Sequence, residues 1–408
     1  MNSSPMDRRT VSEWADRISA ELHENILPFW MKRAVDASRG IIIGSVTDDP
    51  DADRTAERGA LLASRVLWTY SAAYLLDRNP AYLETAHLAY RDLVDNFWDD
   101  EHGGLYWSIA ADGTVVNPRK QIYGQAFAIY ALAEYHRASG LKAPLDRAVS
   151  LFELLETHAR EHRHGGYMEA LSREWSEIAD MRLSDADMNV PKSQNTHLHV
   201  MEAYTNLLRT RPDAKVTEAL TMLLEIMIDR IVNSETGHLK LFFSNDWVSQ
   251  SEAVSYGHDI EAAWLLLDAA EALGNDELIQ RLHPLVVTIA ETTLTEGVDT
   301  DGGVFYTGDP SGVVNTDKEW WPQAEAVLGF LCAYQVSEDE RYLKAAWHSW
   351  HFIDKHLIDR RGGEWFRGVS RNGAVLSPPD LKGSFWKCPY HNGRACMEAP
   401  RRLRALLQ

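Results

Sequence analysis

The sequence predicts an all-α protein, an (α/α)6 barrel of six inner and six outer helices with short β-hairpin loops on one face. Three observations predict this fold: a glycine turn that recurs, two helical patterns in each repeat, and a difference in apolar patterning between the two. The chain has 408 residues, 45% hydrophobic and 25% charged, which is typical of a folded globular protein. Length alone suggests two or three domains, but a closed repeat predicts a single domain over residues 1–408.

The recurring turn places a glycine before aromatic or apolar residues. It occurs six times at a drifting but regular period, with first glycines at Gly40, Gly103, Gly165, Gly237, Gly302 and Gly362. Each unit combines this short β-like piece with two helical patterns. We expect helices over 10–36, 57–79, 84–101, 120–140, 145–161, 193–212, 214–233, 258–275, 277–297, 319–339, 341–359 and 392–408.

The two helices of each unit differ in their apolar surface. Residues 61–68 and 260–267 are apolar around most of the circumference, which indicates burial on most sides. Residues 145–156 show one apolar stripe and one charged face, which indicates an outer position. An open superhelix is the alternative, but it would need longer uninterrupted repeats and polar caps.

The charge balance disfavours several classes of partner. The net charge of −19 and the pI of about 5.3 leave no basic face for nucleic acid or anionic lipid. No run approaches the length of a membrane span, and the start from Met1 to Arg9 is too polar for a secretory signal. Three cysteines without paired spacing, Cys332, Cys388 and Cys396, favour buried thiols and a reduced, cytoplasmic setting.

Polar residues recur in the first turns of the expected inner helices, where a plain core would be apolar. If these helices run parallel, their starts meet at one mouth, and the sequence therefore predicts one pocket fed by six segments. The residues concerned are Arg65, Tyr123, Gln125, Asn195, His197, His199, His258, Asp259, Glu261, Glu319, Trp320, Trp321, Gln323, Glu325, Trp386, Tyr390, His391, Asn392 and Arg394.

Each of these residues also has a structural interpretation. Arg65 is equally consistent with a buried ion pair, with Glu261 or Glu325 as partner. Glu261 follows His258 by three positions and can orient its imidazole or cap the helix. His197 and His199 are two apart, so at most one faces the pocket and the other packs in the core; the same holds for Trp320 and Trp321.

Common signatures of metal, phosphate and hydride chemistry are absent from the sequence. There is no H-E-x-x-H, cysteine pair, calcium loop, P-loop, dinucleotide fingerprint or G-x-S-x-G. His258, Glu261 and His391 can in principle form a three-ligand site, but we predict no metal and no cofactor.

The remaining set of side chains suits a sugar. Tryptophan faces pack against sugar C–H groups, while His, Arg, Asn and Glu bind hydroxyls. Histidine has an unperturbed pKa of about 6.5, so each ring takes or gives a proton near neutrality. Two such groups on either face of a carbon favour a proton-transfer isomerisation.

Four motifs resemble the N-acylglucosamine 2-epimerase superfamily, and within it the cellobiose 2-epimerase branch, along nearly the whole chain. The last motif discriminates best, because other branches tend to follow its histidine with Val-Pro-Arg rather than Asn-Gly-Arg. The motifs are SQNTHLH at 193–199, SYGHDIEA at 255–262, EWWPQAE at 319–325 and WKCPYHNGR at 386–394. The resemblance implies an (α/α)6 barrel, in agreement with the repeat count.

The resemblance also implies reversible C2 epimerisation of the reducing-end glucose of a β-1,4-linked disaccharide to mannose, without metal or organic cofactor. In that scheme His391 assists ring opening, and His258 and His391 are the acid/base pair around a cis-enediolate. Glu261 matches a residue that orients His258. The positions that match substrate-binding residues are Arg65, Tyr123, Asn195 and His199 for O1 and O2, Trp321 and Trp386 for ring stacking, and Asp187 for the second sugar. Gln194 stands where this pattern leads us to expect an apolar methionine.

Other functions remain open at this stage. A D-mannose 2-epimerase or aldose–ketose isomerase would use the same chemistry on monosaccharides. A glycoside hydrolase would need two facing carboxylates, for which Glu261 and Glu325 are the available pair. Sugar binding without catalysis is a third alternative. The expected partner is a small-molecule sugar, and the expected state is a monomer or weak homodimer.

Overall fold

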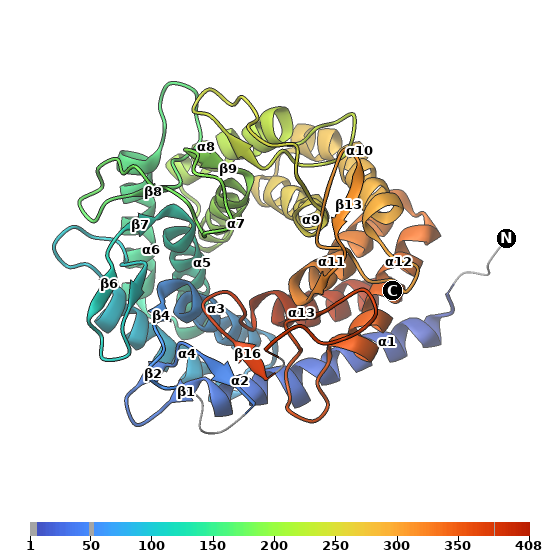
Figure 1. Cartoon of the computed structure of the whole chain (residues 1–408), viewed down its shortest axis with the longest axis horizontal. Coiled ribbons are helices and arrows are strands. Elements are labelled where there is room, and N and C mark those ends of the chain that lie inside the picture. Colours follow the sequence, from blue (N-terminus) through green and yellow to red (C-terminus); the bar gives the residue numbers. More distant parts are fainter. Residues whose placement is uncertain (1–5, 49–52, 379) are drawn as a thin grey trace.

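The computed structural model describes residues 6–48, 53–378 and 380–408, so the first half of the polar start, Met1 to Pro5, lies outside the described residues. Six inner helices form a closed ring (Figure 1), because each contacts the next and the last contacts the first. They are α3 (Ala60–Asp77), α5 (Ile122–Ser139), α7 (Gln194–Thr210), α9 (Tyr256–Leu273), α11 (Trp320–Ser337) and α13 (Tyr390–Ala405). The predicted closed (α/α)6 barrel is confirmed.

An outer ring of helices surrounds the inner one (Figure 1). It consists of α1 (Arg8–Ala20), α2 (Leu27–Arg33), α4 (Pro80–Asp92), α6 (Lys142–Leu154), α8 (Ala214–Ile226), α10 (Asp276–Thr292) and α12 (Glu340–Phe352). A π-helical segment joins α1 to α2, and shorter ones extend the other five: η1 (Glu21–Ile26), η2 (Leu93–Phe97), η3 (Leu155–Ala159), η4 (Met227–Ile231), η5 (Thr293–Gly297) and η6 (Ile353–Leu357).

Some predicted boundaries were wrong by a few residues. The helix predicted over 10–36 ends at Arg33, where the chain turns into a strand. The helix predicted from 84 begins at Pro80, because Asn79 caps it and proline fits the first helical position. The last inner helix begins at Tyr390 rather than 392, so His391 lies in its first turn.

Burial follows the predicted layers. Every residue of α11 from Trp320 to Ala333 is buried, whereas α8 buries one stripe that includes Val216, Leu220 and Leu223. An inner helix is covered by its two ring neighbours and by outer helices, whereas an outer helix packs mainly on the inner ring. Burial of such apolar side chains contributes about 1.5–3 kcal/mol each for Val, Leu, Ile or Phe, which makes this double layer the main source of stability.

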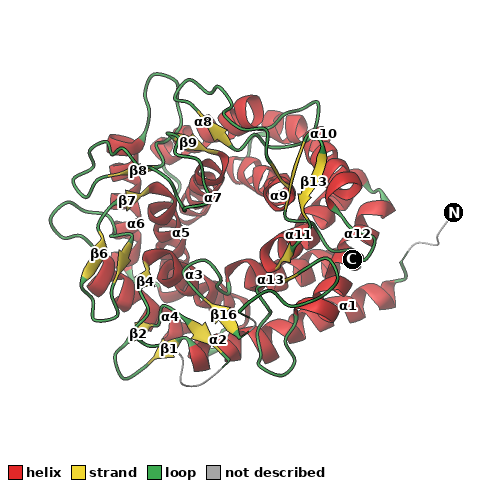
Figure 2. Cartoon of the chain, in the orientation of Figure 1, coloured by secondary structure: helices red, strands yellow, loops and turns green. Residues whose placement is uncertain are grey.

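Short antiparallel strands lie at one end of the ring (Figure 2). A strand that enters an inner helix pairs with the loop that returns after the next outer helix, so that each unit closes on itself. The pairs are β1 (Val35–Asp36) with β2 (Ile41–Ile42), β3 (Val46–Thr47) with β16 (Leu381–Gly383), β7 (Lys120–Gln121) with β8 (Ala170–Leu171), β9 (Lys192–Ser193) with β10 (Phe242–Phe243), and β14 (Lys318–Glu319) with β15 (Gly368–Val369). The triplets are β4 (Arg58–Gly59), β5 (Ser108–Ile109) and β6 (Val115–Asn117), and β11 (Val254–Ser255), β12 (Thr307–Asp309) and β13 (Gly312–Asn315).

Four of the polar residues singled out in the inner helices hold these hairpins in place. Gln125, His197, Asp259 and Gln323 are each the fourth residue of their helix, and each accepts a backbone N–H from the residue after a glycine turn. The donors are Leu105 at 2.8 Å, Tyr167 at 2.9 Å, Leu239 at 2.8 Å and Val304 at 2.6 Å. His197 is therefore the core histidine of the His197/His199 pair.

The close approach of hairpin and helix explains one of the glycines. Gly166 has φ +84°, in the left-handed region, and a Cβ there would lie 2.6 Å from His197 Nε2. Any other residue would be strained and would push the histidine away from its backbone partner.

Buried lysines fix the same loops by ion pairs. Lys120 contacts Asp99 at 2.8 Å, Lys192 contacts Glu161 at 3.2 Å, and both lysine side chains are fully buried. Lys318 and Lys382 repeat the arrangement in later units, with Asp299 at 2.9 Å and Asp359 at 2.6 Å. Within the described residues, no helix is long and apolar enough to cross a membrane.

Candidate active site

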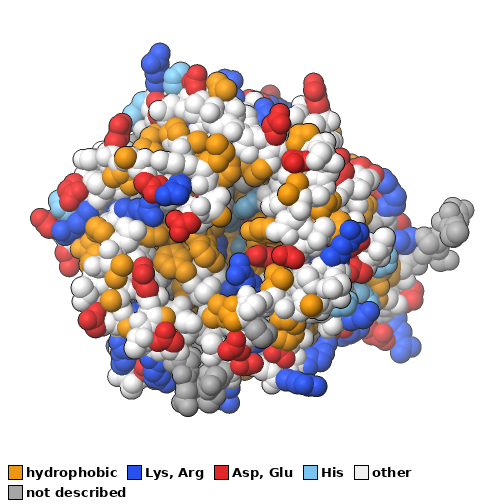
Figure 3. All heavy atoms as spheres, in the orientation of Figure 1, with side chains coloured by type: hydrophobic (Ala, Val, Ile, Leu, Met, Phe, Trp, Pro, Cys, Tyr) orange, Lys and Arg blue, Asp and Glu red, His pale blue; other side chains and the backbone are white. Residues whose placement is uncertain are grey.

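The starts of the inner helices surround a cavity of about 360 Å³ at the strand-bearing end of the ring. All six inner helices or the segments that enter them contribute to its wall, and Figure 3 shows the hollow at the centre of this face with a histidine inside it. The structure brings all ten predicted site residues into this one wall: Arg65, Tyr123, Asp187, Asn195, His199, His258, Glu261, Trp321, Trp386 and His391.

The depth of each side chain follows from its position along its helix. Tyr123, Asn195, Trp321 and His391 are the second residues of their helices and line the upper wall. Arg65, His199 and Glu261 are sixth residues, one turn deeper, because a turn of helix advances about 5.4 Å. The helix N-termini that meet here also direct partial positive charge towards the cavity.

Each of the two candidate acid/base histidines has one ring nitrogen fixed and one left for chemistry. Nδ1 of His391 contacts Glu325 Oε1 at 2.7 Å, and Nδ1 of His258 contacts Ser255 Oγ at 2.7 Å. The Trp321 ring lies against both, with centroid distances of 4.7 Å to His258 and 5.6 Å to His391. A carboxylate partner makes Nδ1 of His391 a donor, whereas the Ser255 hydroxyl donates or accepts and so permits either tautomer of His258.

The surroundings keep both histidines neutral. Removal from water, with a smaller contribution from the nearby His199, lowers the pKa of His258 to about 3. Burial, followed by the charges of Arg65 and Arg394, lowers the pKa of His391 well below its usual value. At neutral pH each ring therefore has a free lone pair and is ready to accept a proton.

Beneath the histidines, Arg394 gathers three carboxylates from three different helices. One guanidinium nitrogen contacts Glu261 Oε1 and Glu325 Oε1, each at 2.7 Å, and the other contacts Glu202 and Tyr390. The Tyr390 hydroxyl also donates to Glu202 at 2.5 Å. Glu202 in turn contacts His199 Nδ1 at 2.8 Å, so this cluster orients a third cavity histidine.

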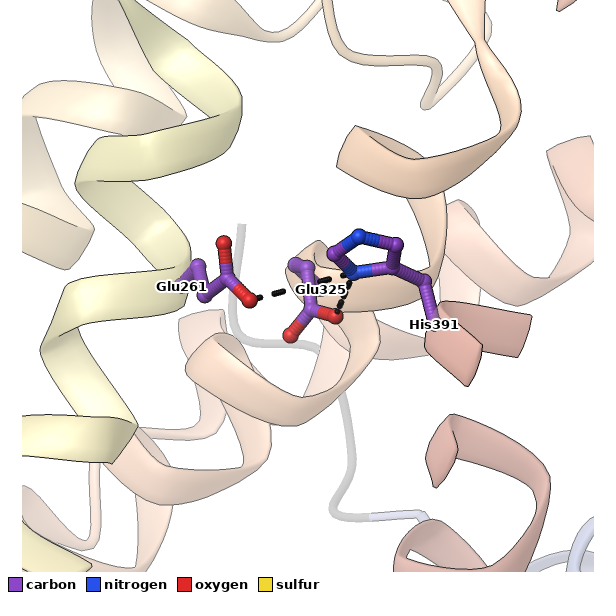
Figure 4. Close-up of side chains that lie close together, drawn as sticks. All are labelled: Glu261, Glu325 and His391. Carbon is purple, nitrogen blue, oxygen red and sulfur yellow. Dashed lines mark hydrogen bonds and ion pairs between the residues drawn. The ribbon is translucent and has the colours of Figure 1, made fainter. Parts of the chain in front are cut away.

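Glu261 occupies a different place from the one expected. Its Oε1 lies 3.8 Å from His391 Nδ1 (Figure 4). The same oxygen contacts Arg394 at 2.7 Å, while the Nδ1 partner of His258 is Ser255. Oε2 of Glu261 is buried without a hydrogen-bond partner among the described residues. Burial and the neighbouring Glu325 raise the pKa of Glu261 well above its usual value, which favours its protonated form.

Arg65 has no carboxylate partner within ion-pair distance in the described parts of the chain, so the alternative of a buried pair with Glu261 or Glu325 is wrong. It donates to the Tyr123 hydroxyl at 2.7 Å and to the Trp386 carbonyl at 3.3 Å. Its guanidinium lies 4.2 Å from the centre of the Phe127 ring. Arg394 neutralises the two glutamates instead, and the charge of Arg65 is left to act on the cavity.

A model of the N-acylglucosamine 2-epimerase family matches residues 42–391. The chain belongs to this family. A cellobiose 2-epimerase from Bacteroides fragilis is 46% identical over 93% of this chain and 96% of its own. The solved structure of cellobiose 2-epimerase from Spirochaeta thermophila is 40% identical with a TM-score of 0.90, over 98% of this chain and 99% of its own. A D-mannose isomerase from Marinomonas mediterranea is 24% identical over 92% of this chain and 94% of its own.

Further residues of this epimerase-family cavity come from segments that sequence patterns did not connect with it. Tyr306 and Arg367 reach the cavity from loops that follow outer helices, and Ser384 and Lys387 precede α13. Arg367 contacts Glu319 at 3.3 Å across the rim. Trp320 and Trp321 both line the cavity, although adjacent helical residues were expected to diverge. Only the helix-start pattern was informative, and loop residues carry no such periodicity.

One group of side chains in this family member approaches the geometry of a metal site. Among the described residues, Glu261, Glu325 and His391 have potential ligand atoms within 4.8 Å of one another. This set replaces the His258-containing set considered from sequence. Its two carboxylates already accept from Arg394 at 2.7 Å, and that guanidinium supplies the positive charge that a cation would bring. The donor set therefore fits a metal poorly.

Proposed function

We propose that this protein is an epimerase that interconverts glucose and mannose at the reducing end of β-1,4-linked disaccharides such as cellobiose, lactose and mannobiose. The observation that carries the proposal is the pair His258 and His391, two neutral imidazoles in one cavity beside the unpaired cation Arg65. The 46% identity to a cellobiose 2-epimerase supports the choice of substrate class.

In the proposed reaction, His391 first assists opening of the sugar ring to the aldehyde. Nε2 of one histidine then removes the C2 proton, and the electron pair of the C–H bond moves through C1 onto O1 to leave a cis-enediolate. Rotation about C2–C3 presents the other face of C2 to the second histidine. That histidine, protonated from water, returns a proton to C2, and the charge on O1 collapses to the aldehyde. The first histidine releases the abstracted proton to water, and the ring closes on the opposite epimer.

The other cavity residues act on the developing charge. We assign Arg65 and the neutral hydroxyl of Tyr123 to stabilising negative charge on O1 and O2, and burial raises the pKa of Tyr123 so that it stays protonated. We assign Asn195 and His199, in the same wall, to the same region of the sugar. We assign Trp321 and Trp386 to ring stacking, and Asp187, from a loop in the cavity wall, to the second sugar.

The proposal extends to conditions of action. The pair of histidines and Arg65 supply proton transfer and charge stabilisation, so we propose a reaction without metal or organic cofactor. The three free, buried cysteines support a reduced, cytoplasmic setting. We propose a monomer or weak homodimer, because all ten site residues come from one chain.

Two alternatives fit the geometry less well. A mannose 2-epimerase or isomerase would use the same histidines, and Asp187 with Trp386 at the mouth favours a site that extends beyond one sugar. A glycoside hydrolase needs two carboxylates on opposite sides of a bound sugar. Glu261 and Glu325 instead converge on one nitrogen of Arg394, and only Glu261 belongs to the cavity wall.

Proton NMR in deuterated water tests the proposal, with metal-stripped protein and cellobiose, and mannose in parallel. We expect deuterium at C2 together with a mannose-ended disaccharide. Turnover of mannose alone would move the enzyme to monosaccharides, and release of free glucose from cellobiose would refute an epimerase.

The catalytic pair is tested by His258→Ala and His391→Ala. Each substitution is expected to abolish turnover while cellobiose binding, measured by calorimetry, is largely retained. A variant with a near-normal rate would remove that histidine from the mechanism.

A further inference from the structure

A side chamber of about 270 Å³ adjoins the active-site cavity under the loop that carries Asp187. The two spaces share wall residues, among them Asp187, Asn195, His258 and Tyr306, so the chamber opens beside a candidate catalytic histidine. Much of the wall that belongs to the chamber alone is apolar: Met188, Val190, Leu241, Phe242 and Ala253. An apolar space with a few polar groups is the usual form of a small-molecule site.

Gln194 is out of place in this wall. It is the first residue of α7, and the first residue of every other inner helix is alanine, isoleucine or aromatic: Ala60, Ile122, Tyr256, Trp320 and Tyr390. Gln194 is nevertheless 1% exposed. Packing at this position of the repeat is satisfied by apolar groups in five units, and a buried amide therefore needs a separate explanation.

The structure shows no interaction within the protein that explains the burial of the Gln194 amide. Its Nε2 is buried without a hydrogen-bond partner among the described residues, and so is Oδ1 of the adjacent Asn195 in the same wall. A buried polar atom left unpaired costs about 1–3 kcal/mol, and native proteins keep few of them. Gln194 therefore leaves an unused amide donor at the wall of the chamber, and a hydroxyl group can accept from it.

We propose that the side chamber is a substrate subsite and that Gln194 is a specificity-determining residue that donates a hydrogen bond to a sugar hydroxyl. The hydroxyl belongs to a carbon away from C1 and C2, because Arg65, Tyr123 and His391, which act on those atoms, line the main cavity and not the chamber. The inference rests on the proposed function and adds to it a contact that selects hydroxylated over deoxygenated substrates.

Gln194→Met tests the proposal, because methionine keeps the length of glutamine and removes both polar atoms. With cellobiose we expect KM to rise about three- to tenfold and kcat to stay within twofold, as for the loss of one binding contact made equally in ground and transition states. The melting temperature of the sugar-free variant is expected to be equal to or higher than that of the natural protein, because an unpaired buried amide has been removed.

Gln323→Met is the matched control. Gln323 is as buried as Gln194, but its amide pairs with the Val304 backbone at 2.6 and 2.8 Å, so its loss is expected to lower the melting temperature. An unchanged KM in Gln194→Met would overturn the proposal, and so would a fall in its melting temperature, which would make Gln194 structural. Failure of the natural protein to epimerise any sugar would instead refute the proposed function.

Discussion

Arg394 contacts more carboxylates than a simple ion pair contains. Its two terminal nitrogens contact Glu202, Glu261 and Glu325, and its side chain is 2% exposed. Burial opposes ionisation of Glu202, but Arg394 and His199 outweigh it and hold its pKa at about 2. Because burial and Glu325 raise the pKa of Glu261, the cluster approaches neutrality by keeping a proton on that residue. The floor of the cavity is thus a charge network in which the buried carboxylates depend on the positive charge of Arg394.

The first prediction concerns this cation. Arg394→Met is expected to lower the free energy of unfolding by about 3–5 kcal/mol, because it leaves buried carboxylates uncompensated. The control Arg209→Met breaks the Arg209–Asp268 pair, whose side chains are 39% and 26% exposed, and is expected to cost at most about 1 kcal/mol. Denaturant unfolding of both variants measures the difference. Equal losses would show that the three carboxylates do not depend on Arg394.

The second prediction concerns pH. Burial lowers the pKa of His197 in the folded chain to about 4, below its value of about 6.5 when unfolded. Between these values the unfolded chain binds a proton that the folded chain does not, so stability falls as pH falls. His197→Gln introduces the side chain found at the same position in α5 and α11. We expect the natural protein to lose about 2 kcal/mol more than this variant between pH 7 and 4.5, measured by denaturant unfolding. Parallel pH profiles would exclude His197 as the source.

At the scale of elements, the repeated unit is a helical hairpin with a polar anchor. The fourth residue of four inner helices holds the glycine turn that follows the next outer helix. Alongside it, a buried lysine pairs with an acid at the turn, as in Lys120 with Asp99. These side-chain bonds take the place of backbone hydrogen bonds that longer strands would form, because strands of only two to four residues form few of them. The loops that shape the active-site mouth are therefore held by side chains of the inner helices and of the strands that precede them.

The third prediction tests this anchor. Gln125→Met removes the acceptor for Leu105 N–H, at 2.8 Å, and the donor to the Leu105 carbonyl, at 2.9 Å. Leaving both backbone groups unpaired is expected to lower the free energy of unfolding by about 2–4 kcal/mol. The exposed Gln250→Met is the control and is expected to change stability by less than about 0.5 kcal/mol. Loss of similar size in both would mean that the anchor contributes nothing specific.

The helices and turns also show which structural features could be predicted from sequence patterns. Six turns and two kinds of helix predicted the ring, because periodicity reports burial directly. The same helix starts predicted most of the ten residues that share one cavity, whereas Asp187, which lies in a loop, was predicted from the family resemblance. Contacts between helices were not predictable: that Arg394 rather than Arg65 neutralises Glu261 depends on how α9, α11 and α13 are rotated relative to one another. Arg367 and Tyr306 were missed because loops have no period to interpret.

At the scale of the whole molecule, the ring is closed by the two ends of the chain. The N-terminal helix α1 packs on the C-terminal helix α13, which also contacts α11 and α3. Glu21, in the segment after α1, is close enough to Cys396 of α13 to raise its pKa, together with burial. The first outer helix of the barrel thus covers the last inner one.

The fourth prediction follows from this closure. The three cysteines are buried, so in the native protein a thiol reagent should react with them only as fast as the protein unfolds. Deletion of residues 1–33 uncovers α13, and Cys396 is then expected to react first while Cys332 in α11 stays protected. Mass spectrometry of the labelled sites distinguishes the two. Equal rates at Cys396 and Cys332 would contradict a local role for the N-terminal helix.

The order of Arg394 and its partners along the chain has a consequence for synthesis. A ribosome has already made Glu202, Glu261 and Glu325 when the helix that carries their cation is still to be translated. The growing chain can stack its hairpins, but the acids have no buried cation to pair with until α13 is made. We therefore expect water to stay between the inner helices during translation until α13 has been added.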